Sequence, residues 1–364
     1  MIKVLMSSTT PVIRDGVTGV MLNLYKNIDK EKFHIDFVAI NEPDEDLKKS
    51  FISDGSNMTI IPREIKHPLR YILQYAKCCK GYDIVHVHGN SATMVLEMLA
   101  AKLAGVHVRV AHSHNTYCVS KTIDKVFRPL FYALCNVRLA CGGAAGKWLF
   151  GKRKFSIVNN GIDTERFMFD SFKRTECRED LNLNDAIVIG NIANFLSAKN
   201  HLFLIDIFNE LFQLNSSCRL ILIGTGELMK KAKDKVAMLG IEPFVLFTGS
   251  VNDVTKFLNA MDVVIMPSLN EGFPLTLVEE QANGLTCYVS DAITKKVNLT
   301  GNVQFLPLKN SALEWATHIN KDYIQVFDRS KKSKESIEMI RENYYDIKDA
   351  ISRLERIYIS LGEK

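Results

Sequence analysis

Short apolar runs of strand length alternate with longer amphipathic segments through the first part of the chain. The expected strands are Ile2–Ser7, His34–Ile40, Met58–Ile61, Asp83–Val87, Val108–His112, Val137–Cys141 and Phe155–Val158. The expected helices are Val20–Ile28, Leu69–Lys80, Ala92–Leu103, Ile123–Leu134 and Ala145–Phe150. This alternation predicts an α/β fold with a parallel sheet and helices on both faces. Ligands of such a sheet bind at the carboxyl ends of its strands.

The same alternation resumes after a charged stretch. The expected strands there are Ala186–Ile192, Arg219–Ile223, Val245–Thr248 and Asp262–Met266, with a helix at His201–Leu214. A chain of 364 residues exceeds what one core supports, so we expect two domains, residues 1–163 and 185–343, joined by a linker at Thr164–Asn184. Three more helices are expected, at Ser311–Asn320, Ser330–Glu342 and Asp346–Ser360, with a break at Tyr344–Asp346.

Composition points to a globular protein of the cytoplasm. No apolar run approaches the roughly 20 residues that cross a bilayer, and the first residues resemble a core strand more than a leader peptide. The 8 cysteines are scattered without a Cys-x-x-Cys pair, which is typical of reduced core residues. The formal net charge of +5 is mild and agrees with an anionic substrate or a lipid surface. We expect no nucleic-acid partner.

Residues 261–291 carry the most information about function. Asp262–Met266 is a buried strand that Pro267 ends, and a turn then leads to Pro274 as the first residue of a helix that Gly284 closes. The N-terminus of a helix that follows the carboxyl end of a strand offers free backbone N–H groups and a partial positive charge. This segment therefore predicts a phosphate site.

Two carboxylates accompany this helix. Glu271 precedes it and Glu279 lies inside it, so both are expected at its mouth, whereas Glu280 is turned about 100° away and is left out of the site. A carboxylate accepts two hydrogen bonds from a vicinal diol. A phosphate and a polyol at one site together indicate a nucleotide sugar. The alternative is an ordinary amphipathic helix with solvated carboxylates.

The pattern from Glu271 to Glu279, Glu-Gly-Phe-Pro-Leu-Thr-Leu-Val-Glu, resembles the Glu-x7-Glu motif of retaining glycosyltransferases of family 4, in particular the bacterial exopolysaccharide and capsule transferases. The resemblance implies the GT-B fold, in which two Rossmann-like domains face a central cleft. The first domain would bind the acceptor and the second the nucleotide sugar. The C-terminal helix, residues 346–364, would cross back to the first domain.

The resemblance also implies roles for residues of the second domain. Lys199 and the helix N-terminus would stabilise the leaving diphosphate, Glu279 would bind the ribose diol, and Glu271 would hold hydroxyls of the donor sugar. Further donor-binding residues would be Gly16, Asn194, Gly249, Ser250, Val251, Gly272, Phe273, Pro274 and Leu275. Asn194 stands where the family has an arginine, so either another cation substitutes for it or the donor is held more weakly.

In the first domain, Asp15 and Gly16 stand where related transferases have a Gly-Gly pair. Gly16 keeps the backbone freedom that the position needs. Asp15 has two readings, since its carboxylate either contacts an acceptor hydroxyl or caps the following helix.

Two His-x-His pairs, His86 with His88 and His112 with His114, end neighbouring strands. They lack a carboxylate or cysteine partner at ligand spacing, so we expect no metal site. The resemblance places them in the cleft, with His112 beside the transferring sugar as an orienting hydrogen-bond group, counted with Lys199 and Glu271 as catalytic, and with His88 and His114 binding the acceptor. The alternative is that they are satisfied groups at strand ends.

The expected activity is transfer of a sugar, with retention, from a nucleoside diphosphate sugar such as a UDP-sugar to a glycan or a polyprenyl-diphosphate-linked acceptor. No cofactor is expected, because protein cations and a helix dipole take the place of a divalent ion at the leaving diphosphate. The alternatives are a nucleotide-sugar epimerase of the same fold and a non-catalytic glycan-binding subunit.

Two basic and aromatic segments suggest contact with the inner face of the plasma membrane. Lys121, Lys125 and Arg128 share an expected helix with Phe127, Phe131 and Tyr132, and residues 147–154 form a second cluster. Such mixtures suit an anionic bilayer surface. The alternative is that the aromatic side chains belong to the core and the basic ones are solvated.

Overall fold

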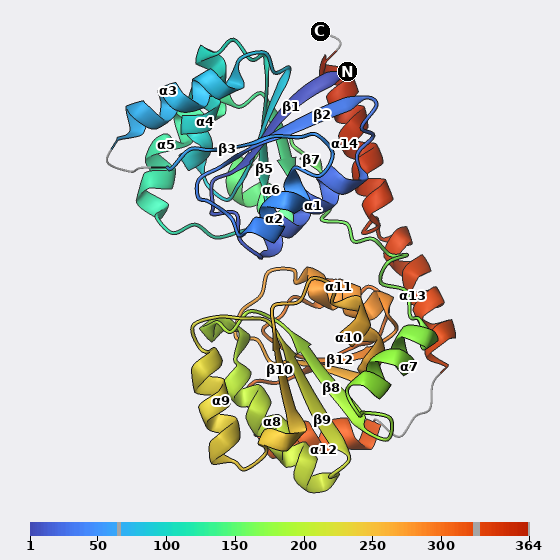
Figure 1. Ribbon diagram of the computed structural model, residues 1–364. Helices are drawn as coiled ribbons and strands as arrows, with labels where there is room; N and C mark the ends of the chain where they lie inside the picture. The colour runs from blue at the N-terminus through green and yellow to red at the C-terminus, as the bar shows by residue number, and fades with distance from the viewer. Residues whose placement is uncertain (64–66, 323–327, 363–364) are drawn as a thin grey trace. The chain divides into compact units, whose positions relative to one another are not determined.

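The computed structural model describes residues 1–63, 67–322 and 328–362, which form two compact units (Figure 1). The first unit comprises Met1–Gly161 and Tyr344–Lys364, and the second comprises Ile162–Asn343. Each unit is a parallel sheet with helices on both faces, so the α/β class with two Rossmann-like domains is confirmed.

The sheet of the first unit has 7 strands in the order β3-β2-β1-β4-β5-β6-β7. The strands are β1 (Ile2–Ser8), β2 (Phe33–Ala39), β3 (Met58–Ile60), β4 (Ile84–Gly89), β5 (Val108–Ser113), β6 (Val137–Ala140) and β7 (Ser156–Ile157). Central strands such as β4 are buried along their whole length, because helices cover both faces of the sheet. The order reverses between β1 and β4, which makes their carboxyl ends the favoured place for a ligand.

Two sets of helices cover this sheet. Helices α3 (Pro68–Cys79), α4 (Val95–Leu103), α5 (Lys121–Leu134) and α6 (Gly143–Phe150) pack around one core with Val85, Val87 and Ala111. Helices α1 (Gly16–Asn27) and α14 (Ile347–Gly362) contact each other, and α14 also contacts β1. The short helix α2 (Glu45–Phe51) begins after its N-cap, Asp44. The C-terminal helix therefore belongs to the first unit, to which the chain returns at Tyr344.

The sheet of the second unit has 6 strands in the order β10-β9-β8-β11-β12-β13. The strands are β8 (Ile187–Ile192), β9 (Cys218–Ile223), β10 (Val245–Gly249), β11 (Val263–Met266), β12 (Thr286–Ser290) and β13 (Val303–Leu306). The helices are α7 (Ser171–Asp180), α8 (His201–Leu214), α9 (Met229–Met238), α10 (Thr255–Ala260), α11 (Leu275–Ala282), α12 (Ala312–Asp322) and α13 (Arg329–Glu342). Four of these elements, α7, α9, α10 and β13, have no counterpart among those expected from the sequence.

The expected linker at 164–184 is wrong, since this segment is part of the second unit. Asp170 caps α7 by accepting hydrogen bonds from the N–H groups of Phe172 and Lys173. Arg174 and Arg178 of this helix both pair with Asp262 at the start of β11, the second at 3.1 Å. The charged side chains that suggested a solvated linker instead attach α7 to the start of β11.

Among the described residues, no helix combines the length and the apolar character that crossing a bilayer requires.

Candidate functional site

The loops that follow β8, β9, β10 and β11 meet at the carboxyl edge of the second sheet. Gly224 adopts a φ of 140°, and a Cβ on it would lie 2.2 Å from the carbonyl oxygen of Ala193, so only glycine fits there. Backbone hydrogen bonds join these loops, from Phe195 N–H to Thr225 O at 2.9 Å and from Leu269 N–H to Ala198 O at 2.7 Å. The segments that carry the expected donor-binding residues are thus held together by the backbone.

Lys199 and Glu271 are brought together although 72 positions separate them. Lys199 lies in the turn Ser197–Lys199 before α8, and its ammonium group donates a hydrogen bond to the carboxylate of Glu271 in the loop before α11. Asn200 makes this turn possible, because its backbone is left-handed, with a φ of 57°, and its side-chain amide donates to Pro267 O at 3.1 Å. A cation and a carboxylate therefore stand at the mouth of α11.

Glu279 and Glu280 sit in different surroundings. Glu279 is half-buried, and burial raises its pKa to about 7, opposed by the positive charge of Arg166. Glu280 is fully buried, and neither of its carboxylate oxygens has a hydrogen-bond partner among the described residues. Burial, and then the charge of Glu279, raises the pKa of Glu280 far above its usual value. Glu279 is consequently the more accessible of the two carboxylates, and its contact with a ligand stays a prediction.

The other residues expected at the donor site, apart from Gly16 of the first unit, lie on the same loops. Asn194 is half-buried in the loop after β8, Ser250 is exposed and Val251 half-buried after β10, and Gly249 ends that strand with a φ of 72°. Gly272, Phe273 and Leu275 surround Pro274, which is the N-cap of α11 and not its first helical residue.

Arg166 is a basic residue of this region that the sequence reading missed. Its charge acts on Glu279, and its guanidinium pairs with Asp253 at 3.1 Å. The segment that contains it was expected to be a linker, so nothing in the sequence marked it.

In the first unit, Asp15 is the N-cap of α1. Its carboxylate accepts a hydrogen bond from the N–H of Thr18 at 2.9 Å, as the capping alternative predicts, and Gly16 is the first residue of the helix. The helix therefore begins four positions before the expected Val20. Contact of Asp15 with an acceptor remains a prediction.

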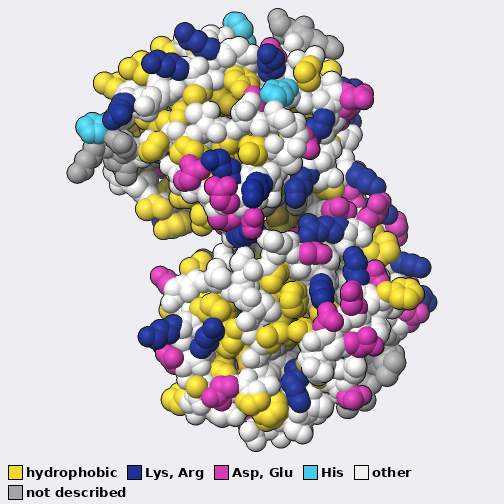
Figure 2. All heavy atoms as spheres, in the orientation of Figure 1, with side chains coloured by type: hydrophobic (Ala, Val, Ile, Leu, Met, Phe, Trp, Pro, Cys, Tyr) yellow, Lys and Arg dark blue, Asp and Glu magenta, His cyan; other side chains and the backbone are white. Residues whose placement is uncertain are grey.

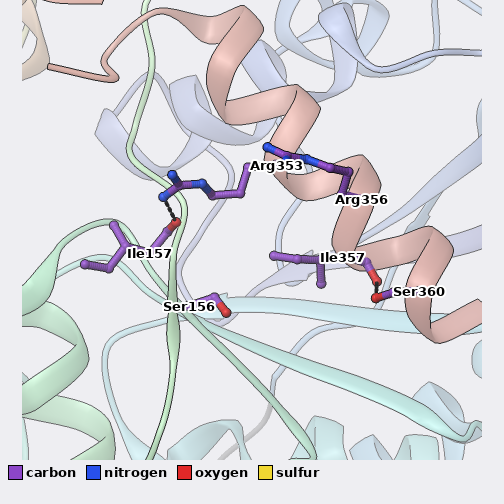
Figure 3. Close-up of a pocket in the computed structure, with 6 residues that line it drawn as sticks. All are labelled: Ser156, Ile157, Arg353, Arg356, Ile357 and Ser360. Carbon is purple, nitrogen blue, oxygen red and sulfur yellow. Dashed lines mark hydrogen bonds between the residues drawn. The ribbon is translucent and has the colours of Figure 1, made fainter. Parts of the chain in front are cut away.

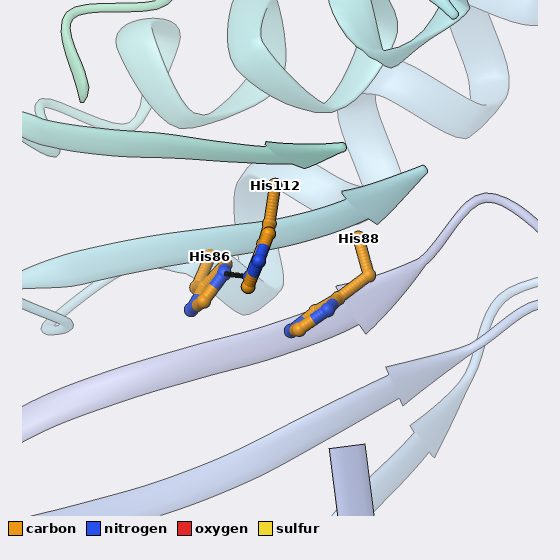
Figure 4. A group of neighbouring side chains, drawn as sticks. All are labelled: His86, His88 and His112. Atoms are coloured by element: carbon orange, nitrogen blue, oxygen red, sulfur yellow. Dashed lines mark hydrogen bonds between the residues drawn. The ribbon is translucent and has the colours of Figure 1, made fainter. Parts of the chain in front are cut away.

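The four histidines form two hydrogen-bonded pairs on one face of the sheet. His86 Nε2 lies 3.2 Å from His112 Nδ1, and His88 Nδ1 lies 2.7 Å from His114 Nε2. The rings of His86 and His88 stack with centroids 4.3 Å apart, whereas those of His112 and His114, also 4.3 Å apart, are tilted by 36°. Each pair joins a residue of β4 to one at the end of β5, and Figure 4 shows the hydrogen bond between His86 and His112 with His88 beside them.

Burial depth differs within this cluster. His86, His88 and His112 are fully buried, and burial lowers the pKa of each imidazole well below its usual range, with further lowering by the other histidines. His114 is half-buried, and burial lowers its pKa to about 4. All four rings are therefore neutral at pH 7. The role of His112 beside a sugar stays a prediction, and in this arrangement His114 is the histidine nearest to solvent.

His86, His88 and His112 each offer a nitrogen within 4.8 Å of the others, which is close enough to consider a shared metal ion. An imidazole binds a metal through a lone pair that lies in the plane of its ring. His86 and His88 stack at an interplanar angle of 17°, so their planes are nearly parallel and separate. One ion cannot lie in both planes, and the geometry favours hydrogen bonding over shared metal ligation.

A pocket of about 480 Å³ in the first unit lies apart from these residues. Ser156, Ile157, Arg353, Arg356, Ile357 and Ser360 line it, and Arg353 donates a hydrogen bond to Ile157 O at 2.8 Å (Figure 3). None of the residues expected at the site from the sequence contributes to it.

Comparison with known proteins identifies the family. A family model described as Glycosyltransferase Family 4 matches residues 14–166, and one described as Glycosyl transferases group 1 matches residues 184–321. The "Putative glycosyltransferase EpsF" of Bacillus subtilis is 31% identical, over 96% of this chain and 95% of its own. The UDP-Gal:alpha-D-GlcNAc-diphosphoundecaprenol alpha-1,3-galactosyltransferase of Escherichia coli is 27% identical, over 79% of this chain and 77% of its own.

The fold has a close counterpart among solved structures. Anabaena HepE in complex with UDP-glucose superposes with a TM-score of 0.79 and 17% sequence identity, covering 99% of this chain and 100% of that chain. The chain therefore belongs to the glycosyltransferases that the group 1 and family 4 models describe, and its fold is GT-B.

Proposed function

We propose that this protein transfers a sugar, with retention of configuration, from a UDP-sugar to a polyprenyl-diphosphate-linked glycan during synthesis of a bacterial surface polysaccharide. The observation that carries the proposal is the pairing of Lys199 with Glu271 in the loop before α11, the helix that also carries Glu279. Support for the donor and acceptor comes from HepE, whose structure contains UDP-glucose, and from the Escherichia coli relative, whose name specifies a UDP-sugar and a lipid-linked acceptor.

The proposed reaction breaks the bond between C1 of the donor sugar and the β-phosphate oxygen, which keeps the electron pair and leaves as UDP. An acceptor hydroxyl forms the new bond to C1 on the same face, and its proton passes to the departing phosphate oxygen. Negative charge grows on the departing oxygen, so the Lys199 ammonium and the free N–H groups at the start of α11 stabilise the transition state. Glu271 accepts a hydrogen bond from this ammonium and so orients it.

Glu279 would bind the ribose of the donor. A diol donates two hydrogen bonds to one carboxylate, and the half-buried position of Glu279 makes these bonds stronger than they would be in water. Gly249, Ser250 and Val251, after β10, would contact the base, and Gly272 to Leu275 the phosphates and sugar. Related proteins have an arginine at the position of Asn194. Arg166, whose charge acts on Glu279, would supply a positive charge in its place.

The stereochemical claim is tested by product analysis. The protein is incubated with a panel of UDP-sugars and a polyprenyl-diphosphate disaccharide, and the anomeric configuration of the product is read by NMR from its one-bond C–H coupling. An α-configured product from an α-linked donor supports retention. A β-configured product would refute it.

Catalysis should not need a divalent metal. Lys199 and the helix dipole supply the positive charge that a metal ion provides in other transferases. Turnover should therefore change less than about twofold when the protein is treated with EDTA and desalted. Loss of activity that Mn²⁺ or Mg²⁺ restores would contradict this prediction.

We further propose that the protein works in the cytoplasm, attached to the inner face of the plasma membrane through α5. The side chains Val119, Ile123, Val126 and Leu130 are 95%, 47%, 68% and 47% exposed. The last three follow a helical spacing that puts them on one stripe. Lys121 and Lys125 are exposed on the same helix, and hydrophobic side chains are visible on this side of the first unit in Figure 2.

The composition of this surface differs from the one expected. Phe131 is fully buried, the Arg128 guanidinium pairs with Asp124 at 2.7 Å, and the Tyr132 hydroxyl donates to Leu149 O at 2.8 Å. These side chains belong to the packing between α5 and α6, as the core alternative predicts. Aliphatic side chains and lysines form the surface that suits an anionic bilayer.

Val126→Asp should weaken binding to anionic liposomes about tenfold or more. The change removes one buried apolar side chain from the membrane contact and adds a charge that the anionic surface repels, together more than 1.4 kcal/mol. Co-sedimentation at low salt measures the effect. The matched control is Phe172→Asp in the second unit, where Phe172 is 87% exposed. Equal sedimentation of both variants and the native protein would exclude α5 as the attachment surface.

A further inference from the structure

The C-terminal helix contributes one polar group to the histidine cluster. Tyr358 of α14 is fully buried, and its hydroxyl lies 2.5 Å from His86 Nδ1. Its ring also contacts that of Phe33, with centroids 5.7 Å apart. Among the described residues the hydroxyl has His86 as its hydrogen-bond partner, and a buried hydroxyl that cannot donate its proton costs free energy.

The contact of Tyr358 with His86 determines which nitrogens carry protons in the pair formed by His86 and His112, called the deeper pair below. Burial raises the pKa of Tyr358, so the phenol keeps its proton and donates it to His86 Nδ1. A neutral imidazole carries one N–H. His86 therefore has its proton on Nε2 and donates it to His112 Nδ1, 3.2 Å away.

The single N–H of a neutral imidazole also determines the tautomer of His112. Because His112 accepts at Nδ1 and is neutral, its single proton lies on Nε2. Nε2 is buried without a hydrogen-bond partner in the described part of the chain, and the backbone carbonyl of Val158 is the neighbour that favours a proton on this ring.

We propose that Tyr358 is a positioning residue of the transferase, which fixes the tautomer of His86 and, through it, makes His112 a hydrogen-bond donor at Nε2. His112 then serves to donate a hydrogen bond and is not poised as a general base. His88 stacks on His86 and forms a hydrogen bond with His114, so the fixed orientation of the deeper pair also positions the half-buried His114. The kinetic consequence rests on the proposed function, whereas the tautomers do not.

The test uses the full-length protein labelled with 15N-histidine. Two-bond 15N–1H correlation spectra distinguish the Nδ1–H and Nε2–H tautomers, and His86→Gln and His112→Gln assign the signals. The expected result is the Nε2–H tautomer at both residues. In Tyr358→Phe, which keeps the ring but removes the proton donor, His86 should become a mixture of tautomers. Tyr75→Phe is the control, because Tyr75 is also fully buried and its hydroxyl contacts Ser7 at 2.6 Å.

The kinetic readout is a split between turnover and donor affinity. Tyr358→Phe should lower kcat about fivefold and leave the KM for the UDP-sugar unchanged, because the expected donor residues other than Gly16 belong to the other unit. An Nδ1–H tautomer at native His86, or signals of Tyr358→Phe that match the native ones, would overturn the proposal. So would stoichiometric displacement of the histidine signals by Zn²⁺, which would indicate a metal site. If Tyr358→Phe does not fold, the native spectrum alone decides.

Discussion

Lys199→Ala should lower turnover about 10²- to 10³-fold, the effect of removing one preorganised group that stabilises developing negative charge. UDP affinity should fall less than about tenfold, because charge on the leaving phosphate is greater in the transition state than in the bound donor. Initial rates with excess acceptor, together with calorimetric titration of UDP, measure the two quantities. Turnover that falls no further than affinity would mean that Lys199 acts only in binding.

The control for this variant must remove a lysine that is similarly buried and also paired with a carboxylate. Lys235→Ala serves, since Lys235 is in the same unit and pairs with Asp206 at 2.6 Å, and neither residue is among those expected at the site. Because Lys199 also pairs with Glu271, Glu271→Gln is measured in parallel. If Glu271→Gln alone reproduced the whole loss, the effect would belong to the carboxylate and not to the ammonium.

Glu279→Ala should weaken UDP binding about tenfold or more while leaving the thermal midpoint within a few degrees of the native value. The variant loses two charge-assisted hydrogen bonds to the ribose diol, and a half-buried carboxylate contributes little to the core. Unchanged UDP affinity in calorimetry would remove Glu279 from the site.

The same carboxylate predicts a dependence of binding on pH. Its pKa is raised to about 7 by burial, so the ionised form that accepts hydrogen bonds increases as the pH rises through 7. UDP affinity should therefore increase between pH 6 and pH 8. UDP itself titrates near this range, so Glu279→Gln provides the reference. The native slope should exceed that of Glu279→Gln, and equal slopes would contradict the assignment.

Much of the fold could be predicted because strand and helix signals are local. The seven strands of the first sheet were expected within two residues at each end, since parallel strands buried on both faces read as continuous apolar runs. The segment Arg166–Asp180 could not be read in this way. Its many charged side chains are typical of a solvated segment. Only the folded structure shows that Arg174 and Arg178 pair with Asp262, which lies more than 80 positions away in the sequence.

The same distinction between local sequence patterns and tertiary contacts applies to the candidate site. Glu271, Glu279 and Lys199 could be selected because a short motif and helical spacing carry them. The pairing of Lys199 with Glu271, the electrostatic effect of Arg166 on Glu279 and the contact of Tyr358 with His86 depend on tertiary packing, and no local pattern in the sequence encodes them. The depth of His112 was missed for a related reason, because a His-x-His pair assigns a face of the strand and not its burial.

The most direct test of the proposed transfer is UDP release measured with and without an acceptor. The native protein is incubated with each of several UDP-sugars, alone and with a polyprenyl-diphosphate-linked glycan, and UDP is quantified by a coupled assay. We predict rapid UDP release from at least one donor when the acceptor is present, and release at least about 100-fold slower without it, since the acceptor hydroxyl is the nucleophile. Release that is equally fast without acceptor would indicate an epimerase or hydrolase, and no release from any donor would indicate a binding subunit.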